Sequence, residues 1–131
     1  MKAQLIMADA ATTHPDGTFS LLRGGISQIN IPRNSPIVFR GALAARISAS
    51  PSERGAHTFR VVCADQDGGL IGHEMTGNFS IAPEGGAGCV VVMIELILPR
   101  LGKYQFSLSV DGHEMDTWPL EAKEIPSTQA R

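Results

Sequence analysis

Apolar and polar side chains alternate along several short stretches of this chain, and this alternation limits the possible folds more than any other feature. In residues 104–110, Tyr104, Phe106, Leu108 and Val110 alternate with Gln105, Ser107 and Ser109. Successive side chains of an extended strand point to opposite faces, so this stretch predicts a strand with one buried face. Residues 37–47 and 59–63 repeat the pattern. No window of a dozen residues has the spacing of an amphipathic helix.

Turn-forming residues separate the alternating stretches and define the strands between them. The expected strands are 3–11, 18–30, 36–48, 57–64, 70–81, 88–98, 103–110 and 113–121. About eight short strands of this kind predict an all-β fold, an antiparallel immunoglobulin-like Greek-key β-sandwich of about 7–8 strands. The stretch 88–98 is apolar on both faces apart from Glu95. We therefore expect it to lie centrally in a sheet.

Five residues have predicted structural roles. The apolar parity changes around Gly24 and Gly25, which predicts a bulge or bend in the second strand. Asp111 and Gly112 stand between two alternating stretches and predict a two-residue hairpin turn, because both positions of a type I′ turn need positive φ. Tyr104 follows a Leu-Pro and a Gly at the start of a strand, as in the tyrosine corner of Greek-key sandwiches. Its hydroxyl is expected to bond a main-chain group a few residues upstream.

Length and charge limit the domain count and the partners. With 131 residues, the chain is expected to form a single domain over 1–122, followed by a disordered tail at 123–131. Charged residues make up only 18% and the net charge is −2, with lysine and arginine scattered singly. Binding of nucleic acid needs clustered cations, so we expect no nucleic-acid partner.

Targeting signals and cysteines indicate the compartment. No apolar run approaches the roughly 20 residues that span a bilayer, and the first residues lack a secretory signal pattern. We therefore expect no membrane partner and a cytoplasmic location. Cys63 and Cys89 are isolated, so we expect reduced core residues and no disulfide.

The tetrapeptide Gly-His-Glu-Met occurs twice, beginning at Gly72 and Gly112, and raises the question of a metal site. Each copy begins the return strand of an expected hairpin and lacks the second histidine of a zincin helix. A metal could still bind if the two hairpin ends met. The candidate ligands are His73, His113, Asp65, Asp67 and Asp116.

Catalytic signatures are missing from the sequence. It contains no Gly-x-Ser-x-Gly elbow and no phosphate-binding loop, so no catalytic residue and no cofactor are assigned. The sequence has a single tryptophan, Trp118, and a single tyrosine, Tyr104, which leaves few aromatic rings for stacking on a sugar. A glycan site would need Trp118 to be exposed.

Two parts of the chain share turn and corner residues with known proteins. They are Ala8–Ala11 with Asp16–Ile26, and Leu98–Pro99 with Gly102–Tyr104 and Val110–Gly112. In these residues the chain resembles a family of small bacterial β-sandwich proteins known only as a domain of unknown function. The resemblance covers most of 3–121 and implies a stand-alone β-sandwich without any assigned chemistry. The Gly-rich loop 85–88 and the C-terminal tail depart from the pattern.

The functional expectation follows from this architecture. Sheet edges with few charges can pair with another strand, which favours a non-catalytic binding or assembly module with a protein partner or a second copy of itself. Two alternatives stay open: a metal-dependent enzyme with a His/Asp site at the hairpin ends, and a small-ligand or glycan binder.

Overall fold

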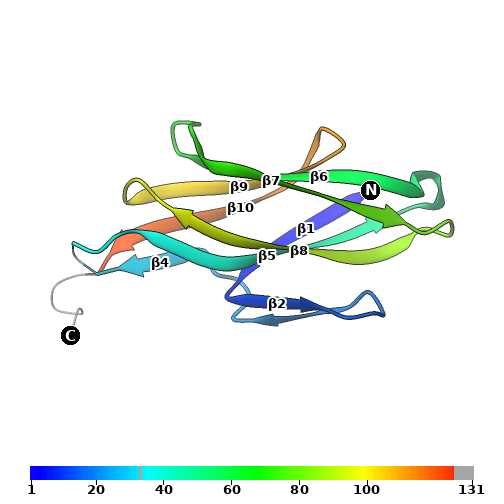
Figure 1. Cartoon of the computed structure of the whole chain (residues 1–131), viewed down its shortest axis with the longest axis horizontal. Coiled ribbons are helices and arrows are strands. Elements are labelled where there is room, and N and C mark those ends of the chain that lie inside the picture. Colours follow the sequence, from blue (N-terminus) through cyan, green and yellow to red (C-terminus); the bar gives the residue numbers. More distant parts are fainter. Residues whose placement is uncertain (33, 126–131) are drawn as a thin grey trace.

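The computed structural model describes residues 1–32 and 34–125, and most of these residues lie in strands (Figure 1). The strands are β1 (Lys2–Ala8), β2 (Ala10–Thr13), β3 (Phe19–Leu22), β4 (Gln28–Ile31), β5 (Val38–Ala49), β6 (Gly55–Asp65), β7 (Leu70–Ile81), β8 (Gly86–Ile97), β9 (Gly102–Val110) and β10 (His113–Glu124). A 3-10 turn, Pro51–Glu53, joins β5 to β6. The prediction of an all-β chain is confirmed. No helix in the described part of the chain is long and apolar enough to cross a membrane.

The strands form two large sheets and one separate hairpin. β1, β5 and β8 make a three-stranded sheet with β5 in the middle, and the other large sheet has the order β4-β10-β9-β6-β7. β2 and β3 form the hairpin. All neighbouring strands are antiparallel except β4 and β10, which run parallel. The three-stranded sheet therefore ends at β1 and β8, and the five-stranded sheet ends at β4 and β7.

The two large sheets enclose one hydrophobic core. The three-stranded sheet contributes Phe39, Leu43 and Ile47, and the five-stranded sheet contributes Val61, Phe106 and Leu108. Phe106 is fully buried while its neighbour Gln105 is exposed. The alternation along β9 thus separates a core face from an outer face, as an extended backbone requires.

The β2–β3 hairpin lies against the outer face of the three-stranded sheet. In Figure 1 it runs below β5 and β8, on the side away from β9 and β10. Ala42 and Ala44 point to this outer face from β5, and both are completely buried. Their small side chains let the hairpin approach closely, so it forms a partial third layer.

The first two predicted strands, 3–11 and 18–30, each divide in two, so the bulge or bend expected at Gly24 and Gly25 lies in a segment between two strands. Arg23 has a φ of 53° and Gly25 a φ of 101°, which ends β3. The amides of Gly25 and Ile26 then donate to the Met7 carbonyl oxygen at 2.7 and 3.0 Å. This contact carries the chain from the hairpin to β4, in the other large sheet.

The prediction that 88–98 lies centrally is wrong for the single chain. β8 pairs with β5 on one side only, over twelve consecutive residues from Val38–Ile97 to Ala49–Gly86, and ends its sheet on the other side. One of its two apolar faces packs on the core, and the hairpin partly covers the other.

The C-terminal strand extends further than expected. β10 was predicted to end at residue 121 but continues to Glu124, and the Ile125 amide donates to the Ile31 carbonyl oxygen at 2.9 Å. Pairing with β4 provides this extension. Residues 126–131 of the predicted tail lie outside the described part of the chain.

Candidate functional site

The five candidate metal ligands are distributed over different parts of the fold. His73 is on β7 and His113 on β10, with β6 and β9 between them in the sheet. Asp65 ends β6 and Asp67 lies in the β6–β7 turn, whereas Asp116 is further along β10. Within residues 1–32 and 34–125, no three His, Cys, Asp or Glu side chains come together as metal ligands.

Asp65 and Asp67 stabilise the β6–β7 turn and connect it to the corner that follows β8. One Asp65 carboxylate oxygen accepts the Asp67 and Gly69 amides at 3.0 and 2.8 Å. Asp67 accepts a hydrogen bond from the Arg100 guanidinium at 2.8 Å. Arg100 in turn contacts Tyr104, whose hydroxyl donates to the Arg100 carbonyl oxygen at 2.6 Å and accepts from its amide at 3.3 Å. The geometry of Tyr104 is therefore that of a tyrosine corner.

Asp116 closes the free edge of β1. The β9–β10 ladder shifts register between Glu114 and Asp116, and this irregularity directs the Asp116 carboxylate at the opposite sheet. It accepts the Leu5 amide at 2.8 Å, while the neighbouring Met7 carbonyl oxygen accepts the amides of the 25–26 segment. The outward Leu5 amide and the outward Met7 carbonyl oxygen thus have partners within the molecule.

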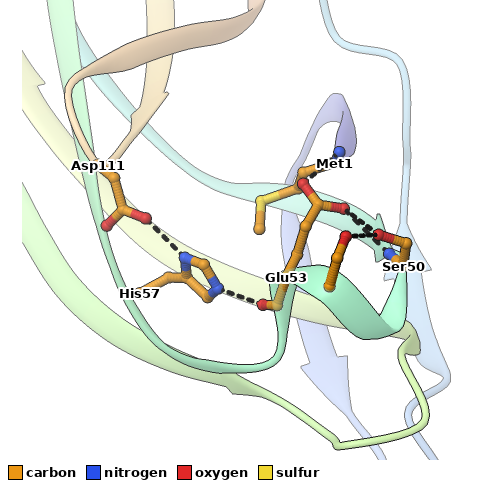
Figure 2. A network of polar contacts seen from close by, with 6 residues as sticks. Met1, Ser50, Glu53, His57 and Asp111 are labelled. Carbon is orange, nitrogen blue, oxygen red and sulfur yellow. Dashed lines mark hydrogen bonds and ion pairs between the residues drawn. The ribbon is translucent and has the colours of Figure 1, made fainter.

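A polar network at one end of the two large sheets was not predicted from the sequence. Figure 2 shows His57, at the start of β6, between the 3-10 turn and the β9–β10 turn. Its Nδ1 lies 2.6 Å from an Asp111 carboxylate oxygen, and its Nε2 lies 2.6 Å from the Glu53 carbonyl oxygen. Both neighbours are acceptors, so only an imidazolium, with an N–H on each nitrogen, satisfies both.

Electrostatics favour the charged ring. The hydrogen bond to Asp111 is the main cause that raises the pKa of His57, and the Glu53 carbonyl adds to it. The pKa of Asp111 is lowered, first by the Thr58 amide that it accepts at 3.0 Å and then by His57. The ring also stacks on Phe79 with centroids 5.4 Å apart, which suits a cation.

Glu53 connects this network to the start of β1. Its carboxylate accepts the Met1 amino group at 2.6 Å and the Ser50 amide at 3.0 Å (Figure 2). These bonds, the one from the amino group first, lower the pKa of Glu53 to about 2. A cavity of about 250 Å³ lies beside Glu53 and His57. Because both His57 nitrogens are engaged, the ring lacks a free base for proton abstraction, and the network acts as a brace.

The two cysteines and Trp118 are the remaining residues that the sequence analysis considered. Cys63 is buried, and burial raises the pKa of its thiol to about 11. Cys89, on β8, is also free and is half-buried. Trp118 packs against the core, and its indole N–H donates to the Ile26 carbonyl oxygen at 2.7 Å. Its ring is therefore engaged in the fold and is not a free stacking surface.

The side of the molecule bordered by β7 and β8 is open. Within the described residues, no main-chain group outside β5 bonds to the main chain of β8. Met93 and Ile97 of β8 are 66% and 75% exposed, and Leu70 at the start of β7 is 62% exposed. A groove of about 560 Å³ runs between the two strands, from Gly72 to Ile97. This open edge is the candidate functional site.

The chain is thus a small all-β domain. Hydrogen bonds from other segments reach the outer side of β1, whereas the outer side of β8 is open. The family model described as a family of unknown function (DUF6941) matches residues 4–123. The chain therefore belongs to the family DUF6941. No curated protein matches it.

Proposed function

We propose that this protein is a non-catalytic binding or assembly module that receives an extended strand at the open edge of β8. One observation carries the proposal: β8 has the composition of a central strand but stands at an edge. Its residues Cys89–Ile94 are all apolar, and Glu95 is its only charged residue. Edge strands that stay unpaired usually carry charges, prolines or bulges, and a long apolar edge is a template for pairing with another chain.

The other strand on this side is less suited to pairing. β7 contains a bulge, since Gly72, His73 and Glu74 stand opposite a single residue of β6, and Gly72 has a φ of 67°. Glu74 also forms an ion pair with Arg60. Bulges and charges both protect an edge. β8 keeps one register with β5 throughout, so its outward main-chain groups form a regular row.

Photo-crosslinking in the native cell tests the proposal. A photoreactive side chain replaces Met93 on β8 or, as a matched control, Leu22 on the hairpin, which is 65% exposed. We expect Met93 to crosslink to an extended segment of a protein chain, and Leu22 to give no such product. The Met93 crosslink should also disappear when Val91 is changed to lysine. Equal yields at both positions would contradict the proposal.

We also infer that the two large sheets form an immunoglobulin-like Greek-key sandwich. Tyr104, near the start of β9, and its bond to Arg100 support this, because such a corner is typical of that fold. The chain also changes sheet between β5 and β6 and again between β8 and β9, as in these domains. An experimental structure with β5 and β6 paired in one sheet would refute the inference.

For the compartment we propose the cytoplasm. The free thiols of Cys63 and Cys89 support a reducing environment. Cell fractionation followed by immunoblotting measures it, and recovery of the protein outside the cytoplasmic fraction would contradict it.

A further inference from the structure

We infer that the strand received by β8 is β8 of a second copy of this chain, paired antiparallel about a two-fold axis at Val92. The inference rests on the proposed binding function and names its partner. In such a dimer two three-stranded sheets join into one continuous sheet, and β8 becomes a central strand. This position accounts for the central-strand composition that the single chain leaves unexplained.

The sequence of β8 is compatible with its own antiparallel copy. Directly opposite side chains point to the same face of a sheet, so the axis must pass through a residue. Pairing about Val92 gives the contacts Val91 with Met93, Val90 with Ile94, and Cys89 with Glu95 of the second copy. Exposed Met93 thus meets an apolar partner. The two Glu95 side chains lie six residues apart along the pair, or about 20 Å, so the only charge in the strand does not meet its own copy.

Charge on the outer face also favours this register. Arg46 of β5 is exposed and lies directly across from Cys89 in the β5–β8 ladder. Glu95 of the second copy would lie beyond Cys89 on the same face, two strand spacings or about 10 Å from Arg46. Both side chains are long enough to meet over Cys89. Each dimer would contain two such pairs because the axis repeats them.

The hairpin distinguishes this axis from one at Val91. Its tip approaches the beginning of β8, since a Cβ on Gly17 would lie 3.4 Å from the Ala87 carbonyl oxygen. An axis at Val91 would place Glu95 of the second copy opposite Ala87, beside this tip. The axis at Val92 places the apolar Ile97 of the second copy there in place of the charged Glu95, so no carboxylate comes to lie beside the Ala87 carbonyl oxygen.

The two-fold symmetry of the proposed dimer limits the assembly to two chains. A two-fold contact uses the same surface on both copies and closes after two chains. No apolar β8 edge then remains, and the bulge and charges of β7 protect the neighbouring edge. A second copy therefore satisfies the outward main-chain groups of both β8 strands at once.

Disulfide trapping tests the pairing and its register. Glu95→Cys places a thiol opposite the natural Cys89 of the second copy, and Glu95 is 70% exposed, so the variant should fold. Opposite Cα atoms lie about 4.5–5.5 Å apart, within the range of a disulfide. We expect a covalent dimer after mild oxidation, and none when Cys89→Ser is added. Met93→Cys serves as the register control and should stay monomeric on a denaturing gel, because Val91 stands opposite.

Light scattering at tens of micromolar supplies the second measurement. We expect the natural protein to be a dimer, and Met93→Lys to raise its dissociation constant about tenfold, since the axis repeats each lost contact. Leu22→Lys should leave the dissociation constant unchanged.

Each failure has its own meaning. A monomer, or a dimer in which Glu95→Cys does not crosslink, overturns the second-copy inference. So does a crosslink of Met93→Cys in place of Glu95→Cys. If the photoreactive group at Met93 still crosslinks to another protein in the cell, the proposed binding function stands with a different partner. If that crosslink is missing as well, both fail.

Discussion

The two edge strands of the three-stranded sheet, β1 and β8, differ in how their outward main-chain groups are hydrogen-bonded. Both pair with β5 on one side and leave a row of main-chain groups on the other. On β1, Asp116 accepts the Leu5 amide, and the 25–26 segment donates to Met7. On β8, no corresponding main-chain contact exists in the described residues. Two outward main-chain groups of β1 are therefore bonded within the chain, whereas those of β8 have no main-chain partner among the described residues.

The largest expected difference comes from placing the same charge on each strand. Met7 of β1 is fully buried, so Met7→Lys should destabilise the fold by at least about 3 kcal/mol, because its ammonium group has no partner in the core. Met93→Lys on β8 should change the stability of the monomer by less than about 0.5 kcal/mol. Urea unfolding at low protein concentration measures both. Similar losses at the two positions would show that β8 is not an open edge.

Two carboxylates, Asp116 beside β1 and Glu95 on β8, provide a second comparison. Asp116→Ala leaves the Leu5 amide without its acceptor and should destabilise by about 1–3 kcal/mol, whereas Asp116→Asn keeps an acceptor and should lose less. Glu95→Ala removes only an exposed ion pair with Arg40 and should cost less than about 0.5 kcal/mol. Chemical denaturation at neutral pH provides the values. An Asp116→Ala variant as stable as the natural protein would refute our account of the closed edge.

Tyr104→Phe tests how much the corner between β8 and β9 contributes to stability. The corner after β8 is held by the Tyr104 hydroxyl and Arg100, so the substitution should cost about 1 kcal/mol through the lost hydrogen bond. Hydrogen exchange should become faster at residues 98–102 while the amide of Leu5 on β1 stays protected. An unchanged unfolding midpoint would remove the corner as a source of stability.

The smallest effect concerns pH and the network that anchors the start of β1. The folded-state pKa of His57 is raised, so its contribution to stability is complete below about pH 6.5 and is lost as pH rises through the folded-state pKa. The lowered pKa values of Glu53 and Asp111 act oppositely, and their contribution is lost as the medium becomes acidic. We therefore expect maximal stability slightly below neutral pH.

Thermal unfolding across the pH range checks this expectation. His57→Gln should flatten the decline on the alkaline side. His14→Gln, on the exposed hairpin, provides the control and should keep the natural profile. An alkaline decline that persists in His57→Gln would assign the pH dependence to another group.

Much of the strand layout was predictable because the signals are local. The alternation in 104–110 and the Asp-Gly pair at 111–112 locate β9, the turn and β10 without knowledge of any distant residue. The polar network around His57 was not predictable in this way. His57 and Asp111 are 54 positions apart, and neither has a neighbour in the sequence that indicates the other. The five metal candidates lie at three separate places in the fold: His73 on β7, Asp65 and Asp67 at the β6–β7 turn, and His113 and Asp116 on β10.

Most strands could be predicted from the sequence, because side-chain parity and turn chemistry act over a few residues. The division of 3–11 and 18–30 into four strands could not. Which strands lie at sheet edges depended on the tertiary fold. The stretch 88–98 looks like a central strand, yet β5 pairs with it on one side alone and β1 takes the remaining position beside β5. Strand order depends on contacts between distant segments, which the local pattern does not encode. In the same way, packing decided that Asp116 would close one side of the sheet while β8 stayed open on the other.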